Sequence, residues 1–171
     1  MKLHNVIPVF FSLLLLACDN SGTSTLNNTK NKIKIPVKAI DFRLPDLAGK
    51  THSLNEYLNK GPVLLVFFTT WCPYCKKEIP NLKQAYYNYG DKNLQLVAIN
   101  AGLTDSLSNA KNYALKNRLP YVVLYDEDAK VSAQYGLKTV PKIFYIQQDR
   151  NIVLTSRKVQ KQTIEDLLGA Q

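Results

Sequence analysis

The sequence has few side chains that bind metals, with three cysteines and two histidines among 171 residues. A structural zinc site usually takes four cysteine or histidine ligands in two pairs. His4 and Cys18 fall in an N-terminal segment with a separate role, so Cys72, Cys75 and His52 remain. Three ligands are too few for such a site, and nothing in the sequence places His52 beside the cysteines to form an open one. We expect no bound metal.

The N-terminal apolar run is too short to cross a membrane. It covers residues 6–16, about half of the roughly 20 residues that a transmembrane helix needs. The run follows Lys2 and ends in LLAC at 15–18, an arrangement typical of a signal peptide. A short buried helix is the alternative, but the N-terminal position and the basic start favour a signal peptide at 1–17.

The LLAC segment resembles the lipobox of bacterial lipoproteins. The resemblance implies cleavage before Cys18, whose sulfur and new amino group then carry acyl chains that anchor the protein. Residues 18–32 are then a lipidated tether, because the stretch is polar and lacks apolar periodicity. In enterobacterial lipoproteins an acid at the position of Asp19 marks retention at the inner membrane. We therefore expect the protein at the extracytoplasmic (periplasmic) face of the bacterial inner membrane.

Acidic side chains are in the minority: 22 lysines and arginines oppose 13 aspartates and glutamates, for a formal net charge of +9. A basic balance can indicate nucleic-acid binding. Here the basic residues are scattered, and an exported protein does not meet nucleic acid. We expect no nucleic-acid partner, and instead a solvated surface that attracts anionic lipid or acidic partners.

Residues 33–171 alternate apolar runs with helical segments, and no repeat is visible. The unbroken apolar run at 63–68 is typical of a strand buried on both faces. Further strands are predicted at 94–99, 121–125, 143–146 and 152–155, and helices at 73–89, 106–118, 129–135 and 163–168. A short hairpin at 42–53 turns at Ala48-Gly49, and Ser53 with Glu56 fits a capping box that begins a helix.

This alternation predicts one α/β domain. Its centre is a mixed β-sheet, mostly parallel and finished by an antiparallel hairpin, with helices on both faces and an N-terminal β-hairpin extension. Cys72 and Cys75 lie where the strand at 63–68 turns into the helix at 73–89, which is the end of the sheet where open α/β folds place their sites.

The two-residue spacing of Cys72 and Cys75 admits several chemistries besides zinc. Covalent haem attachment requires His directly after the second cysteine, and position 76 is Lys. Copper chaperones of the Sco type have cysteines three residues apart and a distant His. A structural disulfide over so short a loop removes little chain entropy. Thiol–disulfide exchange is therefore favoured, with the protein's own Cys72–Cys75 disulfide in place of a cofactor.

The start of a helix activates a cysteine, because its unpaired N–H groups and positive dipole end stabilise a thiolate. Pro73 suits the first helical turn, where its missing N–H has no consequence, and Lys76 and Lys77 add positive potential. Cys72 is thus expected to be the nucleophile. Cys75, one turn further along, is expected to resolve the mixed disulfide.

The WCPYC segment at 71–75 after a buried strand resembles the thioredoxin superfamily. Pro80 occupies the position of the proline that kinks the active-site helix in that family, and TVP at 139–141 looks like its cis-proline loop. The buried Asp of thioredoxin is replaced by Val66. The resemblance implies that the backbone of the loop pairs with a substrate peptide like an added strand. It implies six substrate-binding residues: Trp71, Pro73, Tyr74, Thr139, Val140 and Pro141.

Glu78 in CKKEIP matches the TlpA/ResA-like branch, membrane-tethered thiol reductases of the AhpC/TSA-redoxin type, in which a Glu at this position tunes the thiols. An ordinary exposed helix Glu is the alternative. Residues 41–68 also resemble this branch, so the resemblance covers roughly residues 40–168. Peroxiredoxins share that region, but Leu65 stands at the Pro position of their Pro-x-x-x-Thr-x-x-Cys pattern, and CxxC is foreign to it.

The branch implies a monomeric reductase that receives electrons from a membrane thiol transporter (CcdA/DsbD-like). Its targets would be disulfides of exported proteins, for example the CxxCH cysteines of apocytochrome c during cytochrome c maturation. An oxidase or isomerase on the same fold, or a copper or haem carrier without catalysis, remains an alternative.

Overall fold

The computed structural model describes residues 37–169. The predicted signal peptide, Cys18, the tether at 18–32 and the predicted start of the domain at residue 33 lie outside these residues. A five-stranded sheet forms the centre, in the order β5-β4-β3-β6-β7. Its strands are β3 (Val63–Phe68), β4 (Gln95–Ala101), β5 (Val122–Asp126), β6 (Lys142–Ile146) and β7 (Ile152–Ser156).

The sheet is mixed, as the alternation of strands and helices predicts. Strands β3, β4 and β5 run parallel, β6 runs antiparallel to β3, and β7 returns antiparallel to β6. The helices are α1 (Leu54–Leu58), α2 (Pro73–Tyr89), α3 (Leu107–Lys116), α4 (Lys130–Gln134) and α5 (Lys161–Gly169). Each predicted helix and strand is present, with ends that differ by at most two residues.

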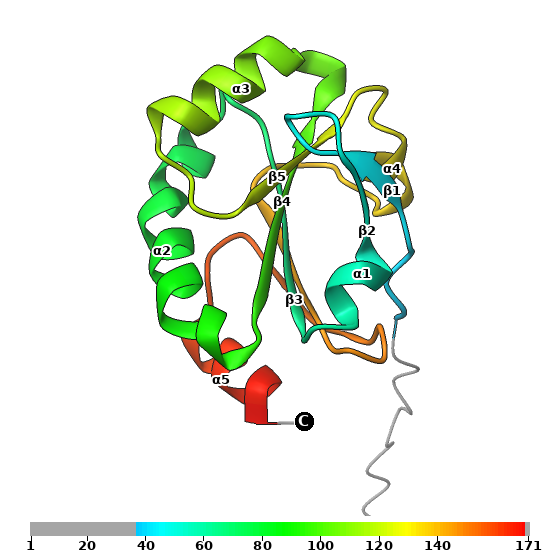
Figure 1. Cartoon of the computed structure of the whole chain (residues 1–171), viewed down its shortest axis with the longest axis vertical. Coiled ribbons are helices and arrows are strands. Elements are labelled where there is room, and N and C mark those ends of the chain that lie inside the picture. The colour runs from blue at the N-terminus through cyan, green and yellow to red at the C-terminus, as the bar shows by residue number, and fades with distance from the viewer. Residues whose placement is uncertain (1–36, 170–171) are drawn as a thin grey trace, which may run out of the picture. The chain divides into compact units, whose positions relative to one another are not determined.

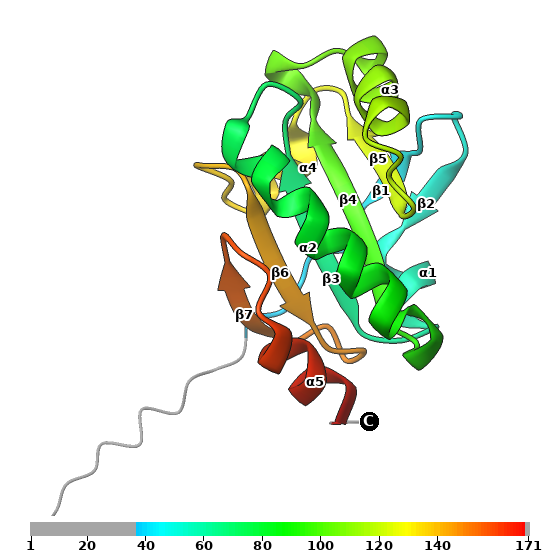
Figure 2. The ribbon, with the colours of Figure 1, turned by 90° about the vertical axis from the view of Figure 1, so that its left-hand side faces the viewer.

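Both faces of the sheet are covered, which explains why every residue of β3 is buried. Leu64, Val66 and Phe68 pack with α2, α3 and α5 on one face, and the alternate residues of β3 pack with α1 and α4 on the other. Figure 1 shows the sheet edge-on between these layers. Figure 2 shows α2 lying across one face of the sheet.

The predicted N-terminal hairpin is present as β1 (Arg43–Pro45) and β2 (Thr51–Ser53), which pair antiparallel. Ser53 begins α1 by accepting a hydrogen bond from the amide of Glu56 at 3.2 Å. This is the forward half of the predicted capping box. In the part of the chain that the structure describes, no helix combines the length and the apolar character that crossing a membrane needs.

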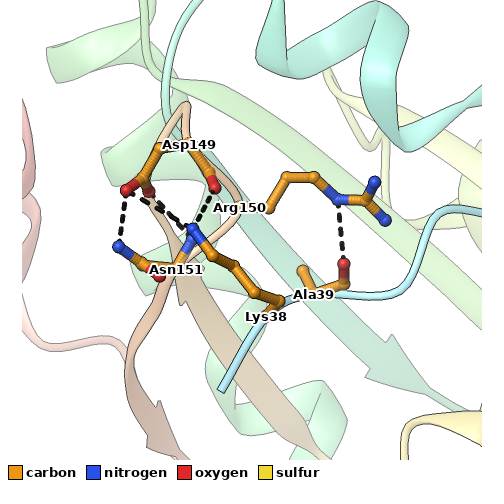
Figure 3. A network of polar contacts seen from close by, with 5 residues as sticks. All are labelled: Lys38, Ala39, Asp149, Arg150 and Asn151. Atoms are coloured by element: carbon orange, nitrogen blue, oxygen red, sulfur yellow. Dashed lines mark hydrogen bonds and ion pairs between the residues drawn. The ribbon is translucent and has the colours of Figure 1, made fainter. Parts of the chain in front are cut away.

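The segment that enters the domain is held at the turn between β6 and β7 (Figure 3). The Nζ atom of Lys38 contacts the backbone carbonyl of Asp149 at 2.8 Å and its carboxylate at 3.6 Å. Ala39 donates its amide to Arg150 and accepts from the guanidinium of the same residue at 3.0 Å. This turn follows Ile146, which pairs with the first residue of β3. The described chain therefore begins at the end of the sheet opposite the start of α2.

Candidate active site

Cys72 is the N-cap residue of α2, directly after the loop that follows β3. Its Sγ atom accepts a hydrogen bond from the amide of Cys75 at 3.2 Å. Pro73 is the first residue of the helix, where no N–H is needed. The two cysteines are free thiols in this structure and only 3% and 4% exposed. The helix start thus directs an N–H group at the sulfur of Cys72, in the way the sequence predicts.

The loop before β6 lies against Cys72. The Val140–Pro141 peptide bond is cis, as predicted, and the Sγ atom of Cys72 donates to the carbonyl oxygen of Val140 at 3.6 Å. Pro141 is buried, whereas Thr139 is exposed and makes no contact with either sulfur among the hydrogen bonds of the described residues. The structure therefore brings the CxxC segment and the predicted substrate-binding loop together.

A small cavity lies behind Cys75. The centre of a water molecule can occupy about 20 Å³ of this cavity, which is enough space for about one water. Its lining residues are apolar apart from Cys75, Glu78 and two tyrosines, Tyr113 and Tyr121. Val66, at the position of the thioredoxin aspartate, contributes part of the apolar wall.

Glu78 is 6% exposed, so the alternative of an ordinary surface glutamate is wrong. Its Oε2 atom accepts from the amide of Val159 at 3.1 Å and from the side chain of Asn81 at 3.2 Å. No direct hydrogen bond joins Glu78 to a sulfur among the described residues. Glu78 lines the same cavity as Cys75 instead, and the two bonds fix its carboxylate.

Burial raises the pKa of the Cys75 thiol well above its ordinary value, and the adjacent Cys72 thiol adds to this effect. Burial likewise raises the pKa of Tyr113, with further contributions from Cys75 and Cys72. The Tyr113 hydroxyl has no hydrogen-bond partner among the described residues. Cys75 therefore holds its proton more tightly than an ordinary thiol.

Asp105 holds the loop between β3 and α2, and the sequence gives no sign of this role. Its buried carboxylate accepts from the amide of Thr70 at 2.6 Å, from the hydroxyl of Thr70 at 2.8 Å, and from Asn100 at 2.9 Å. Trp71 donates its indole N–H to the carbonyl of Thr104 at 3.2 Å. These contacts fix the two residues that precede Cys72.

Arg157 is a second residue that the sequence does not single out. Its Nη2 atom lies 3.5 Å from the carbonyl oxygen of Val140, which also accepts from Cys72. The same guanidinium lies over the ring of Tyr74, 5.6 Å from its centroid. Arg157 thus connects the loop to the exposed residue between the two cysteines.

His52 lies away from the cysteines. Its Nε2 atom contacts Asp46 at 3.1 Å and its Nδ1 atom contacts the hydroxyl of Tyr57 at 3.0 Å. Tyr57 packs on the face of the sheet opposite the cysteines. Across residues 37–169 no group of three or more potential ligands is placed to hold a metal.

Comparison with known proteins agrees with this geometry. The sequence profile of the AhpC/TSA family matches residues 35–155. The thiol-disulfide oxidoreductase ResA of Bacillus anthracis is 34% identical over 140 residues, which cover 82% of this chain and 78% of that protein. The protein of the same name from a strain of Bacillus cereus is 31% identical over 160 residues, covering 92% and 90%.

Solved structures show the same fold. The putative thiol:disulfide interchange protein DsbE of Chlorobium tepidum superimposes with a TM-score of 0.70 at 26% identity, covering 78% of this chain and 97% of that one. The peroxidoxin BcpB of Mycobacterium tuberculosis superimposes with a TM-score of 0.65 at 24% identity, covering 78% and 93%. The second likeness concerns the fold alone.

Proposed function

Since this chain belongs to the AhpC/TSA family and is a thiol-disulfide oxidoreductase of the ResA/TlpA-like type with the thioredoxin fold, we propose that it reduces disulfides of exported proteins through Cys72 and Cys75. The observation that carries the proposal is the position of Cys72. Its sulfur caps α2, accepts from the amide of Cys75 and contacts the carbonyl of Val140. A reactive sulfur thus lies beside a backbone segment that can bind a peptide.

The reaction is a two-electron transfer in two exchanges. The thiolate of Cys72 attacks one sulfur of the substrate disulfide, forms a mixed disulfide and releases the other substrate sulfur as a thiolate. Cys75 then attacks the sulfur of Cys72, which forms the Cys72–Cys75 disulfide and releases the substrate as a dithiol. The substrate is reduced and the enzyme is oxidised. A membrane thiol transporter (CcdA/DsbD-like) would restore the enzyme dithiol.

Glu78 is the group that accepts the proton of Cys75 in the second exchange. The high pKa of Cys75 means that little thiolate forms without a base. Glu78 lines the cavity behind Cys75 and is held there by Val159 and Asn81. A single water in the cavity would connect the carboxylate to the thiol. Glu78 therefore acts on Cys75 rather than on the first attack by Cys72.

The residues around the sulfur of Cys72 would bind the substrate. Trp71 and Tyr74 are 59% and 60% exposed, so they offer aromatic surface on either side of Cys72. The exposed Pro73 and Thr139 extend this surface. The backbone of Val140, followed by Pro141, would pair with an extended peptide.

The location and the partners belong to the same proposal. Lipidation at Cys18 would tether the domain to the outer face of the inner membrane. The described chain begins at the end of the sheet opposite Cys72. Apocytochrome c, with its CxxCH cysteines, is one substrate of the proposed type.

Trapping of mixed disulfides tests the proposal. Cys75→Ser removes the resolving thiol, so partners are expected to accumulate on Cys72, where mass spectrometry identifies them. Cys72→Ser is the matched control, and it is expected to trap nothing because the raised pKa of Cys75 leaves little thiolate to attack a substrate. Accumulation on Cys75 in the control, with none on Cys72, would reverse the assigned roles.

A further inference from the structure

We propose that a basic hollow beside the Val140 loop binds a carboxylate of the protein substrate, so that the enzyme prefers disulfides with an acidic residue nearby. This inference rests on the proposed function, because it assigns the class of substrate to the same site.

The hollow has a volume of about 370 Å³ and lies beside the start of β6 and the end of β7. Three of its lining residues are cationic and three carry hydroxyl groups, and none is acidic. The lining residues are Gly136, Lys138, Thr139, Lys142, Thr155, Ser156 and Arg157. Ammonium, guanidinium and hydroxyl groups are the donors that carboxylates accept.

The three cations have no carboxylate partner among residues 37–169. The ion pairs of the described chain involve other residues, and none includes Lys138, Lys142 or Arg157. The Nζ atom of Lys142 contacts only the neutral carbonyl of Gly136, at 3.5 Å, and lies over the ring of Phe144. Three like charges gathered without a counter-ion repel one another, so an anion that enters the hollow relieves this repulsion.

Arg157 connects the hollow to the reacting sulfur. It contacts the carbonyl oxygen of Val140, and that oxygen is 3.6 Å from the sulfur of Cys72. A peptide that adds as a strand beside Val140 advances about 3.3 Å per residue. A carboxylate about two residues from the substrate cysteine would therefore reach the hollow.

The other side of the CxxC segment is also positive. A second hollow there is lined by Lys76, Lys116, three asparagines, Thr70 and Tyr113, again with no acid. The carboxylates of Glu78 and Asp105, which belong to the site, are buried and already accept hydrogen bonds. The basic side chains could also attract an anionic lipid surface. A peptide carboxylate is favoured because Arg157 connects the hollow to Val140, whose carbonyl oxygen also contacts the reacting sulfur.

Two cyclic disulfide peptides test the inference with the full chain. They differ only in an Asp or an Asn two residues from one cysteine, and the second-order rate of their reduction is measured at low and high salt. We expect the Asp peptide to react about fivefold faster at low salt, the size expected of one exposed ion pair, and the advantage to shrink at high salt. Equal rates would overturn the inference while leaving the proposed function intact.

Variants assign the preference to the hollow. Lys138→Gln should lower the ratio of the two rates, and the double variant Lys138→Gln/Lys142→Gln should lower it further, because two of the three cations of the hollow are then neutral. Lys50→Gln makes the same charge change on the exposed β1–β2 turn and should keep the full preference. A preference that is unchanged in both hollow variants would overturn the inference.

Binding is measured separately, so that a failure to reduce either peptide counts against the proposed function alone. Linear peptides with Ser in place of Cys are titrated while backbone amide shifts are followed by NMR. The Asp peptide should shift the amides of 136–142 and 155–157 more than the Asn peptide does. Equal shifts with the two peptides would overturn the inference. Shifts produced only by vesicles of anionic phosphatidylglycerol would also overturn it, and would identify the surface as a lipid contact.

Discussion

The sulfur of Cys72 lies 3.6 Å from the carbonyl oxygen of Val140 and donates to it. The two residues are 68 positions apart in the chain, and the antiparallel pairing of β3 with β6 brings them together. Under the proposed function, a peptide bound along the Val140 loop would have its disulfide next to the nucleophile. The same oxygen is also contacted by Arg157, which connects substrate binding to the basic hollow.

The role of Glu78 predicts a selective kinetic defect. Glu78→Gln should slow the resolution of the mixed disulfide by about 100-fold at neutral pH, the usual size of a lost general base. The first attack by Cys72 should keep its rate. Rapid-mixing experiments that separate formation of the mixed disulfide from its decay measure both steps.

The glutamine variant also serves as its own structural control. The Gln side chain keeps an oxygen that accepts from the amide of Val159, so unfolding by urea should show little change in stability. If the folded Glu78→Gln protein resolves the mixed disulfide at an unchanged rate, Glu78 has only a structural role.

Burial of Cys75 predicts a loss of stability in alkali for the reduced protein. Its folded pKa is raised above the ordinary value of 9.0, so the folded state holds a proton that the unfolded state releases. The stability contributed by this difference is fully present below about pH 9 and is lost as pH rises toward the folded pKa. The free energy of unfolding should fall by up to about 1.4 kcal/mol per pH unit for this proton.

Denaturant unfolding of the reduced protein from about pH 8 to about 10.5, a range that brackets the ordinary thiol pKa, measures this slope. Cys75→Ser lacks the titrating group while keeping the buried tyrosines, whose pKa values are also raised. The wild type should therefore lose stability more steeply than the variant. Parallel curves for the two proteins would contradict the prediction.

The Asp105 contacts predict a large effect on stability. Asp105→Ala leaves the amide and hydroxyl of Thr70 and the amide of Asn100 without their buried acceptor. We expect a loss of about 3 kcal/mol in the free energy of unfolding. Urea denaturation measures it, with Asp128→Ala as a surface control that should leave the midpoint unchanged. A loss no larger than that of the control would show that Asp105 does not hold the loop.

The order of helices and strands is predictable from the sequence because local patterns determine it. The apolar run of β3, the capping residue Ser53 and the proline at the start of α2 each act within a few positions. The residue at which β4 ends cannot be predicted from such local patterns. The strand continues to Ala101 because it pairs with β5 as far as Asp126. Gly102 then passes so close to the backbone of Asp126 that an added Cβ would lie 2.7 Å from its carbonyl oxygen.

The cysteine pair and the cis-proline loop could also be predicted, since both are carried by short motifs. The contacts of Asp105 and Arg157 could not. They join residues that are 35 and 17 positions apart, and no local pattern determines which side chains meet across such loops. The burial of Glu78 could be predicted only in part. Its position on a helix follows from the sequence, but only the packing of α2 against the sheet shows which face of the helix is covered.

The central claim is that the Cys72–Cys75 pair donates electrons to its substrates, and the reduction potential of the pair tests this most directly. The full chain is equilibrated with redox buffers of known potential, and the fraction of dithiol is read from the mass added by alkylation. We predict a value near that of thioredoxin, about −270 mV. A value near that of DsbA, about −120 mV, would contradict the claim and identify an oxidase.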